Sequence, residues 1–344
     1  MSEGRSFGAR RALPQLDIKS GYHHSPHVVI LGAGASRACC PDGDLCGNVL
    51  PVMKDFVKTL GIGDMIDRNG YDPAENFESV YSAVHKSDNA ALLNDLDLYI
   101  RTYFEQLQLP ETPTAYDYLM LSLKPKDVII SFNWDPLLPQ VFRRWRMLGA
   151  VLPELIFLHG NVDVGFDRQG KRYAFLVDQP DFEPTRLLYP VEQKNYTSDP
   201  FIAEQWKIAT HFLSQAYCVT VFGYSAPVTD VEARSLLLKA WTDNPTHTLG
   251  KFEIIDIRDA VEIEESWFDF IHETHGGVLN EIQRSSLFWH PRRTCEAFAF
   301  ASLQQNPWHA DSFPDIKSLS ELKNWIMPLI SEEASGKLAG KPHH

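Results

Sequence analysis

The stretch HVVILGAGAS, residues 27–36, decides the fold expected for this 344-residue chain. Val28–Leu31 is a continuous run of β-branched and aliphatic residues, which is the pattern of a strand buried on both faces of a sheet. Gly32 and Gly34 then open a tight turn. Small residues in such a turn let backbone N–H groups approach a phosphate, although the same residues also suit a plain strand-to-helix connection.

Four later segments repeat the pattern of an apolar run that ends in polar or small residues. They are DVIISFN at 127–133, LIFLHG at 155–160, YCVTVFGYS at 217–225 and KFEIIDIRD at 251–259. Segments with helical spacing lie between them, as in FIAEQWKIATHFLSQA at 201–216. Strands that alternate with helices predict an α/β fold with a Rossmann-like parallel sheet and helices on both faces.

Three further segments complete the expected organisation. Residues 1–26 are polar and contain Gly and Pro, which predicts a flexible N-terminal arm, with an Arg-rich targeting arm as the alternative. Residues 62–112 are too long for a simple connection and have helical spacing, so we expect a helical insertion within a domain that spans 27–260. Residues 261–344 are rich in aromatic side chains, and we expect this C-terminal extension to pack on the core or on a partner.

Composition excludes several classes of protein. The formal charge of −13 argues against a surface that coats nucleic acid, which needs clustered Lys and Arg. No apolar run approaches the roughly 18 residues of a membrane span. The five cysteines form no CxxC pair, so we expect neither a four-cysteine zinc site nor a disulfide framework, but free thiols in a reducing compartment.

Polar or small residues follow each expected strand at the edge where a parallel sheet binds its ligands. They are Gly32–Ser36, Asn133–Asp135, His159–Gly160, Gly223–Ser225 and Asp256. Each also has a purely structural interpretation: Asn133 suits a turn, Asp135 before Pro136 suits a helix cap, and His159 suits a buried histidine. A dinucleotide fingerprint is excluded at the first turn, because Arg37 stands where the third glycine of G-x-G-x-x-G would be.

Taken together, these segments resemble the sirtuin superfamily. The motifs that carry the resemblance are GAGAS at 32–36, SFNWD at 131–135, LHG at 158–160, GYS at 223–225 and EIIDI at 253–257. The closer resemblance is to the zinc-ribbon-free, sirtuin-like NADases of bacterial anti-phage defence systems. Their further signatures are matched by NFE at 76–78, by Trp206 and Ala216, and by Thr229–Asp230.

Two departures separate the chain from sirtuins that deacylate proteins. Those enzymes carry a four-cysteine zinc ribbon after the HG motif, and this chain has none. Their GAG loop continues into a Gly-Ile-Pro-Asp-Phe-Arg-like segment, whereas here Pro41-Asp42 is kept without the Phe-Arg. The resemblance therefore implies that NAD+ is bound as the substrate, with no metal, and it puts deacylation in doubt.

The resemblance also implies a role for each site residue. Asn133 would orient the nicotinamide ribose or the attacking water, and His159 would act as general base. The remaining positions would bind NAD+: Gly32, Ala33, Gly34 and Ser36 the pyrophosphate, Asp135 the nicotinamide end, Gly223 and Ser225 the phosphate–ribose region, and Asp256 the adenosine ribose. We expect Trp134 to pack away from this site, leaving Asn133 and Asp135 on one side. Arg258 suits a surface ion pair better than the 2′-phosphate of NADP.

The implied function is cleavage of NAD+ to nicotinamide and ADP-ribose by a toxic effector in the bacterial cytoplasm. Because unregulated NADase activity is toxic, we expect gating by homo-oligomerisation or by a partner such as a HerA-like ATPase or a short Argonaute. Neither direct nucleic-acid binding nor membrane binding is expected. The alternatives are a zinc-free protein deacylase and a non-catalytic NAD or ADP-ribose sensor.

Overall fold

The computed structural model describes residues 25–335 except 88, 190–195, 197 and 226–230. The predicted arm at 1–26 therefore lies almost wholly outside the described residues, as do Thr229 and Asp230. Within the described part of the chain, no helix is long and apolar enough to cross a membrane.

The core is a six-stranded sheet in the order β3-β2-β1-β7-β8-β9, in which every pairing is parallel. Its strands are β1 (His27–Leu31), β2 (Val128–Ser131), β3 (Glu154–Phe157), β7 (Cys218–Phe222), β8 (Lys251–Ile255) and β9 (His275–Leu279). Every residue of β1, β2 and β7 is buried, which agrees with their unbroken apolar runs. The predicted Rossmann-like parallel sheet is confirmed.

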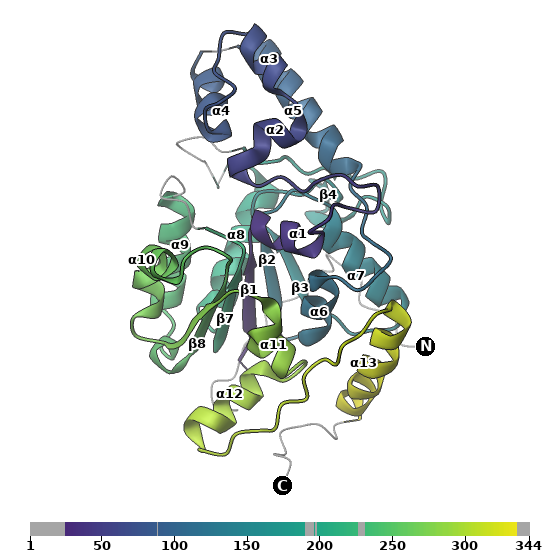
Figure 1. Ribbon diagram of the computed structural model, residues 1–344, viewed down its shortest axis with the longest axis vertical. Helices are drawn as coiled ribbons and strands as arrows, with labels where there is room; N and C mark the ends of the chain where they lie inside the picture. The colour runs from purple at the N-terminus through teal and green to yellow at the C-terminus, as the bar shows by residue number, and fades with distance from the viewer. Residues whose placement is uncertain (1–24, 88, 190–195, 197, 226–230, 336–344) are drawn as a thin grey trace.

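Helices cover both faces of this sheet (Figure 1). One face carries α1 (Ala33–Cys39), α6 (Ala115–Ser122) and α7 (Leu137–Met147). The other carries α8 (Pro200–Leu213), α9 (Val231–Thr242) and α10 (Ala260–Ile271). The two groups of helices lie on opposite faces because the crossovers are right-handed but run in opposite directions across the sheet. They run from β1 towards β3 in the first half of the chain and from β7 towards β9 in the second.

The chain reverses its direction across the sheet between β1 and β7, so the carboxyl ends of these two strands form a topological switch point. Leu31 at the end of β1 pairs with Phe222 at the end of β7 and with Ser131 at the end of β2. Ligands of doubly wound sheets bind at such a point. Three of the predicted motifs, GAGAS, SFNWD and GYS, directly follow these strand ends.

The helices of the segment predicted as an insertion stand at the carboxyl end of the sheet (Figure 1). It contains α3 (Gly63–Arg68), α4 (Phe77–Lys86) and α5 (Ala90–Glu105), and it follows η3 (Met53–Asp55) and α2 (Phe56–Leu60). Asn76 and Asn89 cap α4 and α5 by accepting hydrogen bonds from backbone N–H groups in the first turn. Their buried faces consist of aliphatic and aromatic residues at helical spacing.

A small second sheet lies between β3 and α8, in the order β5-β4-β6. It consists of β4 (Val164–Asp167), β5 (Arg172–Phe175) and β6 (Glu183–Pro184). The predicted hairpin around Gln169-Gly170 is confirmed by the antiparallel pairing of Asp167 with Arg172. The residue with positive φ in this turn is Lys171, not the glycine.

The sequence pattern places the last strand before residue 260, and the structure corrects this limit. β9 extends the sheet to Leu279, and its first three residues are exposed. Because HGGVL has two glycines and no continuous apolar run, it lacks the signal by which the inner strands are predicted. The remaining elements, η4 (His247–Leu249), η5 (Ile282–Arg284), α11 (Ser286–Trp289), α12 (Thr294–Leu303) and α13 (Leu319–Ala334), complete the described chain.

Candidate functional site

The turn after β1 packs directly against the turn after β7. Gly34 N–H donates to Gly223 O at 2.9 Å, and Gly32 N–H donates to Phe222 O at 3.1 Å. A Cβ added at Gly223, whose φ is +61°, would lie 2.1 Å from the backbone nitrogen of Ala35. Glycine is therefore required here because two backbones meet without room for a side chain between them.

This packing changes which groups of the first turn could bind a phosphate. The N–H groups of Gly32 and Gly34 are already bonded within the protein, and Ala35 N–H donates to Gly32 O at 2.9 Å. Ala33 is exposed, and its N–H donates to no residue that the structure describes. Two of the four residues predicted to hold a pyrophosphate, Gly32 and Gly34, thus use their N–H groups within the protein, whereas the N–H of Ala33 remains available.

The exits of β1 and β2 are joined through the hydroxyl of Ser36. Its Oγ donates to Asp135 Oδ2 at 2.6 Å and accepts from Asn133 Nδ2 at 2.9 Å. It also lies 2.8 Å from the hydroxyl oxygen of Tyr116 on α6. These four side chains are all more than 90% buried and form one polar group at the switch point.

Asp135 accepts hydrogen bonds through both of its carboxylate oxygens. Its Oδ1 accepts from the backbone N–H of Leu137 at 3.1 Å, as a carboxylate at a helix start should, while its Oδ2 accepts from Ser36. The structure assigns the N-cap itself to Pro136. Burial raises the pKa of Asp135 above its ordinary value of 3.8, whereas the hydrogen bonds from Ser36 and Leu137 act in the opposite direction.

The backbone around Asn133 is held from the β3 side by Asn161, which sequence reasoning missed. Asn161 Nδ2 donates to Asp135 O at 2.7 Å and to Asn133 O at 3.3 Å. Val162 N–H donates to Trp134 O at 3.0 Å, so the exits of β2 and β3 are tied together. An asparagine two residues after a predicted histidine carries no motif of its own, and only the fold shows what it bonds.

Trp134 packs away from Asn133, as predicted. Its ring centroid lies 5.1 Å from that of Tyr189, 5.8 Å from that of Phe104 and 6.2 Å from that of Phe56. The last two rings belong to α5 and α2. The middle residue of SFNWD therefore anchors the strand exit in the apolar layer beneath the helical insertion.

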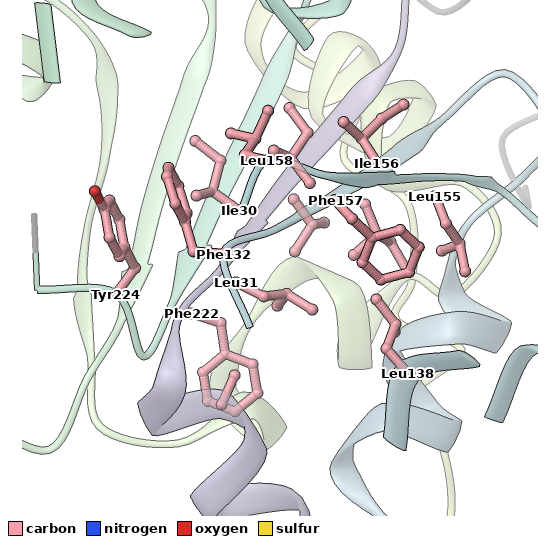
Figure 2. Packing of buried hydrophobic residues seen from close by; sticks show 14 of the residues in the cluster. Ile30, Leu31, Phe132, Leu138, Leu155, Ile156, Phe157, Leu158, Phe222 and Tyr224 are labelled. Atoms are coloured by element: carbon pink, nitrogen blue, oxygen red, sulfur yellow. The ribbon is translucent and has the colours of Figure 1, made fainter. Parts of the chain in front are cut away.

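His159 lies at the exit of β3, in an aromatic cluster that continues towards β7. Its imidazole is 4.8 Å from the ring of Phe132, the residue before Asn133, and Phe132 stacks on Tyr224 at 4.3 Å. Figure 2 shows the rings of Phe132 and Tyr224 side by side, next to Ile30 and Leu158. Gly160 has a φ of +75°, and a Cβ at this position would lie 2.1 Å from Arg186 O. Glycine is therefore required because the backbone at Arg186 passes close to it.

The other predicted residues lie further along the same edge. Ser225 is exposed and is the last described residue before the gap at 226–230. Asp256 follows β8, and its carboxylate accepts bidentate hydrogen bonds from Arg258, with Oδ2 2.9 Å from Nη2. Arg258 also faces Glu262 at 3.5 Å, so the predicted surface ion pair is confirmed.

The five cysteines are all described, and the two that follow the HG motif, Cys218 and Cys295, pack in one buried cluster. Cys39, Cys40 and Cys46 are close to α1, whereas Cys218 begins β7 and Cys295 lies in α12. Among the described residues, no group of three or more His, Cys, Asp or Glu side chains is arranged to hold a metal ion. After the HG motif the sequence has two cysteines, Cys218 and Cys295, fewer than the four of a zinc ribbon.

Comparisons with known proteins yield solved structures only: no protein-family model and no curated protein matches the chain. One match is a structure solved to explain the mechanism and regulation of Sir2 enzymes. The two sequences are 16% identical, the alignment covers 73% of this chain and 93% of that chain, and the TM-score is 0.37. Another is a mutant Sir2 homologue in complex with ADP-ribose. The sequences are 13% identical, the alignment covers 90% of this chain and 95% of that chain, and the TM-score is 0.37. At this level of similarity we assign neither a family nor an activity from the matches. The structural neighbours of the chain are Sir2 enzymes.

Proposed function

We propose that this protein is an NAD+ glycohydrolase, which cleaves the bond between nicotinamide and ribose. The observation that carries the proposal is the buried Ser36–Asn133–Asp135 group at the switch point of the sheet, where such folds bind nucleotides. Hydrogen bonds within the group offset the cost of burying an amide and a carboxyl, and a plain strand exit needs neither side chain. The sequence resemblance to sirtuin-like NADases names the substrate.

The site residues suit the chemistry of this cleavage. The bond breaks through an oxocarbenium-like state, water adds to the ribose carbon, nicotinamide leaves, and the proton of the water passes to a base. His159 is the proposed base, because an imidazole titrates near neutral pH and this one packs against Phe132, the residue before Asn133 in the sequence. Asn133 would orient the ribose or the water, and Ala33 N–H would donate to the pyrophosphate.

A zinc-free protein deacylase is the second candidate, because it would use the same NAD+ site. The positions of the cysteines count against it, since the zinc ribbon of deacylating sirtuins has no counterpart here. The two functions differ in one product: a deacylase yields O-acyl-ADP-ribose and needs an acyl-lysine peptide. A glycohydrolase releases nicotinamide and ADP-ribose without peptide.

We further propose that the activity serves as a toxic effector in bacterial anti-phage defence and is gated in trans. The support is the resemblance of the sequence to such effectors, together with the toxicity that ungated NAD+ loss would have. Gating would come from homo-oligomerisation or from a protein encoded nearby. Co-expression with neighbouring genes, followed by size-exclusion chromatography, tests this part separately from the chemistry.

The decisive experiment measures nicotinamide release from NAD+ by the purified chain, alone and with candidate partners. We expect Asn133→Ala and His159→Ala each to lower the rate by about 100-fold or more, as removal of a catalytic group commonly does. Both variants should keep the melting temperature of the parent within a few degrees, which circular dichroism checks. Parent-like rates in both variants would mean that the site is wrongly assigned.

A further inference from the structure

Tyr116 is a side chain of the site that neither the sequence motifs nor the proposed chemistry requires. It lies in the first turn of α6 and is 1% exposed. Its hydroxyl oxygen is 2.8 Å from Ser36 Oγ and 3.2 Å from Asn133 Nδ2. The phenol thus contacts the two residues that join the exits of β1 and β2.

The start of α6 is fixed by a dense set of hydrogen bonds, so Tyr116 is held in place independently of the site. Thr114 and Asp117 form a capping box, in which Thr114 N–H donates to Asp117 Oδ2 at 2.8 Å. Asp117 Oδ1 also accepts from Trp145 Nε1 at 2.7 Å, and Arg144 Nη1 lies 3.1 Å from the same atom. A helix anchored in this way can impose an orientation on its neighbours.

The orientation of the Asn133 amide follows from its partners. Gly32 O lies 2.8 Å from one end of the amide, and a carbonyl oxygen can only accept, so that end must be Nδ2. The second hydrogen of Nδ2 is directed between Ser36 Oγ and the Tyr116 hydroxyl oxygen. The amide oxygen Oδ1 is therefore turned the other way, and no residue that the structure describes donates to it.

We propose that Tyr116 is a positioning residue that keeps Asn133 Nδ2 directed into the protein and presents Oδ1 to the ligand. An amide oxygen is an acceptor, so the ligand group that it meets must be a donor. If the proposed function holds, that group is a ribose hydroxyl or the attacking water. Without the phenol, Nδ2 loses the most distant of its three acceptors and Ser36 Oγ loses a partner, so the amide is held less firmly in this orientation.

Tyr116 does not act as an acid or a base in this proposal. Burial raises the pKa of its hydroxyl well above the ordinary value of 10, and the nearby Asp135 acts in the same direction. The phenol is therefore neutral at and around neutral pH. Its removal should lower the rate without changing the shape of the pH–rate profile, whereas loss of a general base would change that shape.

The kinetic test compares Tyr116→Phe with Tyr118→Phe, which removes the same atom from the same helix. The Tyr118 ring packs on Phe288 and Phe313, away from the site. We expect Tyr116→Phe to lower kcat for nicotinamide release about tenfold, the effect of one hydrogen bond of about 1.4 kcal/mol, with KM within twofold. Tyr118→Phe should keep kcat within twofold. A kcat for Tyr116→Phe equal to that of the control overturns the proposal.

A second measurement does not depend on activity, so a failure of the proposed function can be told apart from a failure of this inference. The side-chain NH2 resonances of Asn133, assigned by their loss in Asn133→Ala, report the environment of Nδ2. In the unsubstituted protein these protons should exchange with water at least about tenfold more slowly than those of exposed Asn280. They should shift and exchange faster in Tyr116→Phe but not in Tyr118→Phe.

The kinetic and the NMR measurements together distinguish a failure of the proposed function from a failure of the positioning role. If the parent releases no nicotinamide, either alone or with the candidate partners, but the Asn133 protons behave as expected, the proposed function fails and the positioning role stands. If the Asn133 protons exchange as fast as those of Asn280, Nδ2 does not point into the protein and the inference is wrong. The second readout uses the parent protein and therefore holds even if Tyr116→Phe does not fold.

Discussion

At the scale of single residues, glycine is required at this site because the turns after β1 and β7 are in close contact. This requirement does not depend on a ligand. Gly223 combines a left-handed backbone with a position where an added Cβ would be 2.1 Å from Ala35 N and 2.4 Å from Gly34 C. A glycine-rich turn at a strand exit is usually interpreted as a phosphate loop. Here the turn after β7 fills the space that a phosphate loop would leave open, and it occupies the N–H groups of Gly32 and Gly34 but not that of Ala33.

This contact predicts a difference between two glycine substitutions. Gly223→Ala should destabilise the protein much more than Gly61→Ala. Both residues have positive φ, which costs a non-glycine residue about 1–2 kcal/mol, but a Cβ at Gly61 meets nothing within 4 Å. Urea denaturation of the two variants measures the free energies of unfolding. Equal losses would show that the turns after β1 and β7 are not in close contact.

At the scale of elements, His27 joins three segments at the amino end of the sheet. Its Nδ1 lies 2.7 Å from Thr294 Oγ1 on α12, and its Nε2 lies 2.8 Å from Thr220 Oγ1 on β7. Its backbone N–H donates to Asp127 Oδ1 at 2.8 Å. The first residue of β1 is thus a polar connection between the sheet and the C-terminal extension.

A lower pH should reduce the free energy of unfolding through protonation of His27. Burial lowers the pKa of His27 from 6.5 to about 4, so the folded protein keeps the ring neutral while the unfolded chain takes up a proton. The unfolding free energy therefore falls as pH falls from about 6.5 to 4, by up to about 3 kcal/mol from this group. His27→Gln should flatten that pH dependence, whatever its own cost in stability.

The measurement is the slope of unfolding free energy against pH in the two proteins. His290, whose pKa burial also lowers to about 4, contributes to the same pH range, but it is present in both and cancels in the comparison. His272→Gln, at an exposed position on the end of α10, serves as the control. Parallel slopes for the parent and His27→Gln would contradict a neutral, buried imidazole.

Elements also show how far the sequence alone could predict this structure. The inner strands were predictable because burial on both faces leaves an unbroken apolar run, and their polar exits identified the edge where Ser36, Asn133 and Asp135 meet. β9 was not predictable, because an exposed edge strand with two glycines carries no such run. Tyr116 was missed for a related reason: within an apolar helix, a buried tyrosine looks like core, and only the fold brings its hydroxyl to Ser36.

At the scale of the whole molecule, the C-terminal extension packs against the end of the sheet opposite the helical insertion (Figure 1). Arg292 is its main anchor. Its Nη1 donates to Leu123 O after α6 and to Val151 O before β3, and its Nη2 is 2.8 Å from Glu333 on α13. Ser286 on α11 donates to the buried Glu253 of β8 at 2.5 Å. The extension is therefore bound to both halves of the sheet.

These contacts predict that the sheet and the extension unfold together. Arg292 is 2% exposed, and Arg292→Ala would leave Glu333 and two carbonyl groups without their donor, which costs about 3–5 kcal/mol for a buried pair. We expect urea curves from circular dichroism and from tryptophan fluorescence to coincide in the parent and to shift together in the variant. Arg168→Ala, which removes an exposed ion pair with Glu183, should cost no more than about 1 kcal/mol. A separate early transition in Arg292→Ala would instead show that the residues after β9 detach while the sheet remains folded, and the two cooperative units would then meet after Leu279 rather than at residue 260.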